Sequence, residues 1–278
     1  MYKTILVHVD QSARAAQRID LAARLAMQYE AHLVGTALTG LSPYVFPVGG
    51  FDPAMPTVVF PVDELRADAD TALDAFEARA GAAGVTALER RRIDDEAGIG
   101  VSMQARYCDL VIVGQTSRDE FIPRLRSDFP EYVLLNCARP VLIVPATGIM
   151  DGIGNKVMVA WNGSADAVRA ITSALSMLKN AAQVDLVVIN AQAEGDLHGH
   201  IPGADMGLYL ARHGVRVEVS AVEGVADVGE ALLSHAADRG ADLIVMGAYG
   251  HSRFRELFMG GATRTALRSS PLPLWMAH

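Results

Sequence analysis

Short, nearly unbroken apolar runs alternate along this chain with longer helical stretches. Runs such as 184–189 are typical of strands covered on both faces, as in parallel sheets. In the first half the pattern predicts strands at 2–9, 32–37, 86–93, 109–113 and 141–144, with helices near 13–29, 62–83, 99–107 and 129–136. In the second half it predicts strands at 157–160, 184–190, 215–221, 243–246 and 272–276, with helices near 165–180, 204–213, 228–239 and 261–268.

The two halves repeat one pattern. Residues 3–12 match 156–164, residues 108–114 match 241–247, and residues 138–144 match 271–277. The offset falls from about 152 residues at the first match to 133 at the last, so the first half carries about 19 extra residues, which we place at 40–61. This segment is rich in Pro and Gly and predicts a long loop packed on its own domain, in preference to a lid or a contact surface.

Right-handed crossovers make each half an α/β, doubly wound (Rossmann-like) domain: an open, mostly parallel five-stranded sheet with helices on both faces. Ligands of such sheets bind beyond the carboxyl ends of the strands. Residues 146–155 are rich in Gly and turn formers and separate the halves. We therefore expect two domains, 1–147 and 155–278, which agrees with the length of 278 residues.

Charge and composition narrow the function. A net charge of -8 disfavours nucleic acid and anionic membranes as partners, because repulsion precedes contact. No apolar run approaches the roughly 20 residues that a membrane span needs, and the N-terminus lacks the features of a signal peptide. The two cysteines, Cys108 and Cys137, have neither metal-ligand nor C-x-x-C spacing. These features together predict a protein of the reducing cytoplasm.

Glycines cluster where the second half ends a strand and starts a helix. The sequence from Gly247 through Gly250 to Gly260 and Gly261 follows the apolar run 243–246. Glycines allow close approach of a ligand to the backbone, and the N–H groups of Gly261, Ala262 and Thr263 would face an anion with the helix dipole behind them. This pattern predicts a phosphate-binding loop, although it is neither the P-loop nor the dinucleotide fingerprint.

With the turn after the first strand of this half and the closing strand 271–277, this spacing resembles the universal stress protein family, as a tandem two-domain member. ATP-binding members carry G-x2-G-x9-G-[ST], which Gly247, Gly250 and Gly260 match. The resemblance implies a stress-response or regulatory role and binding of ATP, ADP or AMP, with or without Mg²⁺. It places the first-strand turn, Ala160, Trp161 and Asn162, near the adenosine, and the glycine loop on the phosphates.

The second half departs from the family pattern twice. Gly261 replaces the Ser or Thr after the third glycine and lacks its hydroxyl, and Asn162 replaces the acidic residue and brings no charge. Thr263 could supply a substitute hydroxyl. His251 and Arg253 could supply cationic contacts, although loop cations are more often simply solvated.

The first half departs in the opposite way. It keeps an acidic residue, Asp10, and Ser12, but the segment after Gly114 has no second or third glycine, and Pro123 and Pro130 remove backbone donors. We expect this half not to bind ATP in the family manner. Its expected role is to pair with the second half as an internal pseudo-dimer, while a homodimer of whole chains stays open.

Other constellations are weaker. Two histidines, His198 and His200, lie near Asp196 and Asp205, but a solvated turn is the favoured interpretation over a metal site. Trp161 and Trp275 lie in or beside predicted strands and are expected to pack at the sheet rather than stack on a base.

Three functions remain: a nucleotide-binding stress or regulatory protein with at most slow ATP hydrolysis, a regulatory protein that binds a partner and no nucleotide, and an enzyme using adenylate chemistry. The first is favoured. No residue is assigned a catalytic role, because no base or metal-ligand set is evident for the third.

Overall fold

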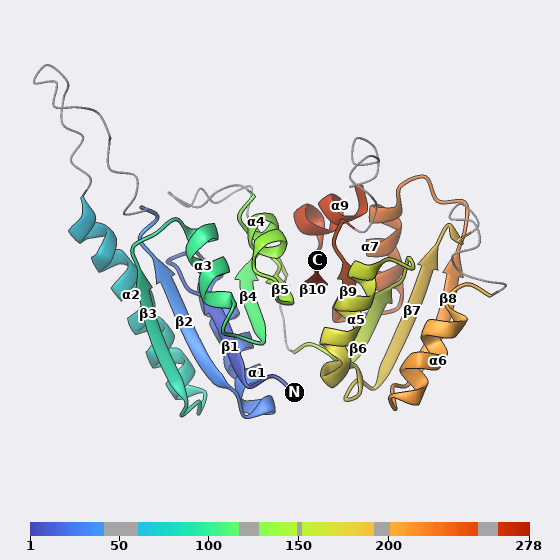
Figure 1. The fold of residues 1–278 in the computed structure, drawn as a ribbon, viewed down its shortest axis with the longest axis horizontal. Coiled ribbons are helices and arrows are strands. Elements are labelled where there is room, and N and C mark those ends of the chain that lie inside the picture. The colour runs from blue at the N-terminus through green and yellow to red at the C-terminus, as the bar shows by residue number, and fades with distance from the viewer. Residues whose placement is uncertain (42–60, 117–127, 149–151, 192–200, 250–260) are drawn as a thin grey trace, which may run out of the picture.

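The computed structural model describes residues 1–41, 61–116, 128–148, 152–191, 201–249 and 261–278. The predicted insertion at 40–61 and the histidine cluster at 198–200 fall almost wholly outside these residues. Each half forms the expected parallel five-stranded sheet, with strand orders β3-β2-β1-β4-β5 and β10-β9-β6-β7-β8 (Figure 1). The doubly wound α/β fold predicted for each half is therefore confirmed.

The elements of the first half follow the predicted order. They are β1 (Thr4–His8), α1 (Ala15–Tyr29), β2 (His32–Leu38), α2 (Val62–Ala82), β3 (Leu88–Ile93), α3 (Ala97–Ala105), β4 (Leu110–Gly114), α4 (Phe129–Asn136) and β5 (Val141–Val144). Asp109 precedes β4, and its carboxylate accepts hydrogen bonds from the backbone N–H groups of Lys3 and Thr4. This contact fixes the start of β1 beside the start of β4.

The second half repeats this course. Its elements are β6 (Lys156–Ala160), α5 (Ala165–Leu178), β7 (Gln183–Ile189), α6 (Ala204–Arg212), β8 (Val217–Val222), α7 (Val228–Asp238), β9 (Leu243–Gly247), α9 (Gly261–Ser269) and β10 (Leu274–Ala277). Asp242 repeats the role of Asp109, because its carboxylate accepts from the N–H groups of Gly154, Asn155 and Lys156. The Asp at the second position of each matched segment, 108–114 and 241–247, therefore aligns the starts of two neighbouring strands.

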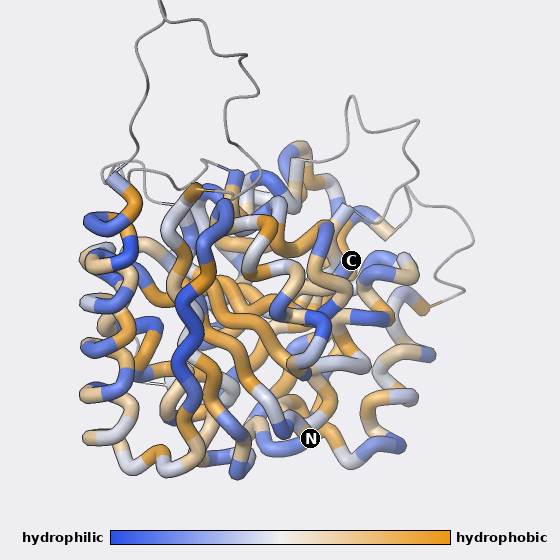
Figure 2. The backbone as a smooth tube through the Cα atoms, turned by 60° about the vertical axis from the view of Figure 1, so that its left-hand side comes forward, coloured by the Kyte–Doolittle hydropathy of each residue, from blue (hydrophilic) through white to orange (hydrophobic). Residues whose placement is uncertain are grey.

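Helices cover both faces of the sheet, and each covered face continues from one half into the other. Helices α1, α2, α5 and α6 bury one face, while α3, α4, α7 and α9 bury the other. Neighbouring residues of one strand serve opposite faces: Ile5 and Val7 join the first core, and Leu6 joins the second. Figure 2 shows the apolar central strands enclosed by more polar helices.

The two sheets are not separate, which the sequence pattern did not predict. β5 and β10 pair antiparallel, with Leu142 opposite Trp275, and join the halves into one ten-stranded sheet. Trp275 is fully buried, as expected, and its Nε1–H donates to Ser173 Oγ at 3.0 Å. The ring of Tyr2 lies 5.3 Å from that of Trp275, and its hydroxyl donates to the Ser173 carbonyl. The halves therefore form a covalently linked pseudo-dimer with a shared hydrophobic core.

Candidate functional site

The carboxyl ends of β6 and β9 lie side by side in the second half. Ala160 is in register with Met246, so Trp161 and Gly247 leave the sheet at the same edge. The next residue, Asn162, accepts a hydrogen bond from the Ser164 N–H through its side-chain oxygen. Ser164 in turn caps α5, and this chain of contacts shapes the first-strand turn.

Helix α9 begins beside this edge. Thr263, in its first turn, accepts a hydrogen bond from the Tyr249 N–H at 3.4 Å and is only 6% exposed. Its hydroxyl therefore holds the backbone of Tyr249 against α9. Gly261 is exposed, and a Cβ on it would meet none of the described residues within 4 Å, whereas Ala262 packs partly against the core. The structure thus brings together the predicted residues Ala160, Trp161, Asn162, Gly247, Gly261, Ala262 and Thr263.

Four predicted binding residues, Gly250, His251, Arg253 and Gly260, lie outside the described part of the chain. Of the first two loop glycines, only Gly247 can be placed. A Cβ on Gly247 would stand 2.4 Å from the backbone nitrogen of Ala167 and 2.6 Å from the carbonyl carbon of Asp166. Gly247 is therefore required by the close packing of α5 on β9, whereas the sequence had suggested close approach of a ligand.

The equivalent edge of the first half is filled by an arginine. Arg18, on α1, is almost fully buried; its Nε–H donates to the His8 carbonyl and its NH2 group lies 2.7 Å from Asp10 Oδ1. A Cβ on Gly114 would stand 2.5 Å from the NH1 atom of Arg18. The guanidinium thus lies between the carboxyl ends of β1 and β4, where the fold places ligands.

The charges of this first-half cluster are set by burial and by Arg18. Burial works to raise the pKa of Asp10, but Arg18, followed by His8 and Ser12, holds it well below its ordinary value. Burial lowers the pKa of His8 to about 4, so the imidazole is neutral near neutral pH. Asp10 and Arg18 therefore form a buried ion pair beside a neutral histidine.

Sequence reasoning missed Arg18, although the repeat contains the signal. At the offset of 152 that aligns Ser12 with Ser164, Arg18 corresponds to Ala170, which is fully buried. A charged residue at a position that the other half fills with a buried alanine needs a buried partner. Asp10 is that partner.

Comparison with known proteins agrees with this geometry. A sequence profile of the universal stress protein family matches residues 1–145 and again residues 154–278. The chain belongs to the universal stress protein family. A curated relative, a universal stress protein of Synechocystis sp., is 27% identical over 146 residues, which are 52% of this chain and 48% of the relative. The match thus spans about half the length of that relative.

Two solved structures resemble almost the whole of this universal stress protein. One, a universal stress protein from Archaeoglobus fulgidus, has a TM-score of 0.73 and 18% identity and covers 99% of this chain and 95% of its own. The other, a protein of unknown function from Pseudomonas aeruginosa, has a TM-score of 0.63 and 16% identity and covers 99% and 92%. At these identities the likeness shows the fold.

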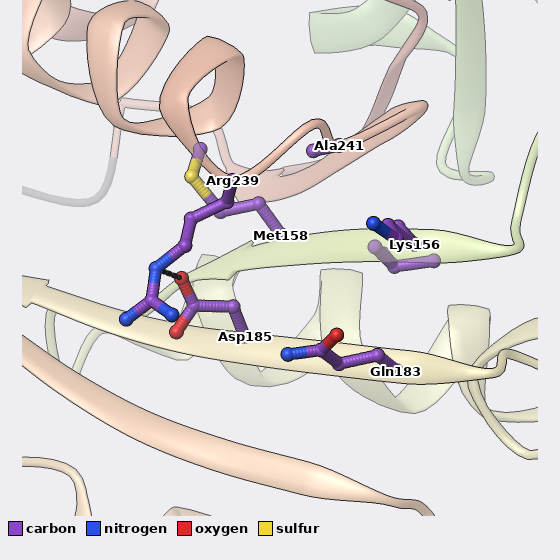
Figure 3. Close-up of a pocket in the computed structure, with 7 residues that line it drawn as sticks. Lys156, Met158, Gln183, Asp185, Arg239 and Ala241 are labelled. Atoms are coloured by element: carbon purple, nitrogen blue, oxygen red, sulfur yellow. Dashed lines mark ion pairs between the residues drawn. The ribbon is translucent and has the colours of Figure 1, made fainter.

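A small pocket lies away from the glycine loop, toward the amino ends of β6 and β7. Figure 3 shows its lining residues, which are Lys156, Val157, Met158, Gln183, Asp185, Arg239 and Ala241. This pocket opens at the end of the sheet opposite to the carboxyl ends of these strands, where α/β sheets bind ligands. It does not coincide with the candidate site.

The buried Asp185, which lines this pocket, forms ion pairs and a hydrogen bond with neighbouring side chains of this universal stress protein. Its carboxylate lies 2.7 Å from His235 Nε2 and 3.4 Å from Arg239 Nε, and it accepts a hydrogen bond from Ser220 Oγ. Ser220 and Asp185 both approach the same ring nitrogen of His235. In a nucleophilic triad the acid and the serine contact opposite nitrogens of the histidine ring. The arrangement of Asp185, Ser220 and His235 therefore fits a structural role and not a triad.

Neither metal ligation nor thiol chemistry is evident in the described residues. They contain no group of three or more His, Cys, Asp or Glu placed to hold a metal ion. Cys108 and Cys137 are buried free thiols, and burial raises the pKa of Cys108 to about 11. Burial also raises the pKa of Cys137, so both thiols favour the protonated form near neutral pH. Within the described ranges, no helix is long and apolar enough to span a membrane.

Proposed function

We propose that this universal stress protein binds ATP or a related adenine nucleotide through its second half, in a stress-response or regulatory role. The observation that carries the proposal is the position of the α9 N-terminus. Gly261, Ala262 and Thr263 begin α9 beside the carboxyl ends of β6 and β9, and Tyr249 and Thr263 are joined by a hydrogen bond. The glycine spacing shared with ATP-binding members of the family supports the same conclusion.

The proposed roles follow from the chemistry of these groups. The first N–H groups of a helix have no acceptor within the helix, and together with the dipole they favour a phosphate oxygen. Asn162 keeps the turn that Asp10 makes in the first half, because both side chains accept from the serine N–H two residues later. A ribose hydroxyl would therefore meet an amide in place of a carboxylate. We assign no catalytic residue.

The first half is proposed to bind no nucleotide in this manner. Its equivalent edge holds the Asp10–Arg18 pair, and a buried guanidinium occupies the space beside Gly114. The expected stoichiometry is one nucleotide per chain.

Calorimetric titration with ATP and Mg²⁺ tests the proposal, using Gly261→Asp as the decisive variant. Aspartate in the first turn favours the helix by about 0.3–1 kcal/mol while placing a negative charge where the phosphates would lie. Two like charges about 4 Å apart repel by about 4 kcal/mol at an effective dielectric constant near 20, so the affinity should fall by at least about 10-fold. The melting temperature should not fall.

Gly261→Ala is the matched control. A Cβ at this position meets no residue of the described ranges within 4 Å, so alanine should leave both the fold and the affinity intact. If the folded wild-type chain gives no binding heat, the nucleotide proposal is wrong, and a partner-binding regulatory role becomes the better explanation. Equal binding by Gly261→Asp and wild type would exclude α9 as the phosphate site.

A further inference from the structure

A side chain of the first half reaches the loop that follows β9. The hydroxyl of Tyr249 donates a hydrogen bond to Glu131 Oε1 on α4, which is 118 residues away in sequence. Tyr249 is half-buried and has φ of 57°, in the left-handed region that non-glycine residues rarely adopt. Such a conformation persists only where its surroundings hold it, so the contact with α4 helps to hold Tyr249 in this conformation.

Several charged groups surround this contact. Burial and the hydrogen bond to Glu131 raise the pKa of Tyr249, while Arg264 and Arg268 of α9 act in the opposite direction. The ring of His278 lies edge-on to that of Tyr249 at 6.4 Å. The phenol therefore remains a protonated donor near neutral pH, and Glu131 is its acceptor.

The other end of α9 also contacts the first half. Gln115, which follows Gly114, donates through Nε2 to the carbonyl of Leu267 at 3.0 Å and to that of Ser270 at 3.4 Å. Its Oε1 accepts from the Ala146 N–H, which fixes the amide orientation. Gln115 thus satisfies carbonyls at the end of α9 that lack helical partners.

Within the described ranges, the second half makes no equivalent contacts to the first half's strand ends. At the offset of 133 that matches Gly114 with Gly247, Tyr249 corresponds to Thr116 and Glu131 to Arg264. A threonine hydroxyl and a guanidinium cannot reproduce the phenol–carboxylate bond, and Thr116 Oγ1 is buried without a hydrogen-bond partner in the described structure. The first half therefore supports Tyr249 after β9, and among the described residues no equivalent tyrosine bond runs in the opposite direction.

We propose that the first half acts as a scaffold for the second half's nucleotide site, with Tyr249, Glu131 and Gln115 as positioning residues. The inference rests on the proposed function. Glu131 holds the start of the loop through Tyr249, and Gln115 holds the far end of α9. The half that does not itself bind nucleotide thus makes the site in the other half competent, and nucleotide binding is coupled to α4.

A double-mutant cycle on ATP affinity tests this inference in the full chain. Tyr249→Phe and Glu131→Ala should each weaken ATP binding by about 10-fold, as expected for the loss of a hydrogen bond to a charged group. The double variant should be no weaker than either single variant, because one bond is lost in all three. Glu131→Gln retains a carbonyl acceptor and should recover most of the affinity. Tyr107→Phe, at a tyrosine that is 77% exposed, is the control and should bind as wild type does.

Hydrogen exchange supplies a readout that a purely structural role would not move. Saturating ATP should slow amide exchange across α4 in the wild-type chain but leave it unchanged in Tyr249→Phe. Equal ATP affinity in wild type, Tyr249→Phe and Glu131→Ala would overturn the scaffold inference and leave the proposed function standing. Losses of ATP affinity that add fully in the double variant would do the same. If the wild-type chain binds no ATP, the proposed function fails, and this inference fails with it.

Discussion

The buried ion pair of the first half offers the sharpest test of the structure. Arg18 and Asp10 have side chains that are 3% and 15% exposed, and their charged atoms are 2.7 Å apart. Replacing Arg18 by methionine keeps much of the apolar stem but leaves the Asp10 charge uncompensated. Removing one partner of a buried pair typically destabilises a protein by about 3–5 kcal/mol, so the free energy of unfolding should fall by that amount near neutral pH.

The double variant Asp10→Asn/Arg18→Met separates charge from packing. Asparagine can keep the turn, because Asn162 accepts from the Ser164 N–H at the equivalent position of the second half. With both charges gone, the loss should shrink to about 1–2 kcal/mol, which is the range for a repacked core. Urea unfolding of the three proteins, followed by circular dichroism and by tryptophan fluorescence, measures these values.

The stability lost in Arg18→Met should depend on pH, because Asp10 titrates differently with and without Arg18. Arg18 holds the pKa of Asp10 low, so in the wild type this group adds stability above its unfolded pKa and loses it as pH falls through the folded value. In Arg18→Met, burial instead raises the pKa of Asp10, so the deficit should narrow as the pH falls toward that raised value. A deficit below about 1 kcal/mol near neutral pH, with no recovery in the double variant, would refute the buried-pair interpretation.

Two further predictions concern His8 and Gly247. Burial lowers the pKa of His8 to about 4 from 6.5, so its neutral form adds stability that is lost as pH falls from the unfolded to the folded pKa. In urea unfolding, His8→Leu should reduce the difference in unfolding free energy between about pH 7 and pH 5 by about 2 kcal/mol. The same pH dependence of stability in His8→Leu and in wild type would count against a buried neutral His8. Gly247→Ala places a Cβ 2.4 Å from the Ala167 nitrogen and should destabilise the fold by about 1–3 kcal/mol, measured by thermal unfolding. The matched Gly261→Ala changes the first residue of α9, where a Cβ meets none of the described residues within 4 Å, so it should change stability by less than about 0.5 kcal/mol. Equal effects at both glycines would contradict the packing of α5 on β9.

The sequence pattern was sufficient for most of the fold because strand and helix signals are local. Apolar runs such as 110–114 and 243–247 became buried strands, and even the weakly marked segment 129–136 forms α4 as predicted. The repeat identified the pseudo-dimer. It could not predict that β5 and β10 pair, because pairing of edge strands depends on how two completed domains meet.

The candidate site also combines features that the sequence predicted with others that depend on tertiary packing. The glycine spacing and the strand ends predicted a site, and the structure places Asn162, Gly247 and Gly261 near one edge of the sheet. Binding of a ligand at this edge stays a prediction. The reason for Gly247 lies in the approach of α5, which no spacing rule contains.

By itself, the sequence determined the α/β class, the tandem repeat and the family. These properties depend on periodicity and on glycines at fixed spacing, which can be read within a few tens of residues. Only the tertiary structure decided that Arg18 fills the first half's edge and that Glu131 reaches Tyr249 across 118 residues. Such contacts depend on which distant side chains share one buried volume, and that is settled only when the two halves pack as one sheet.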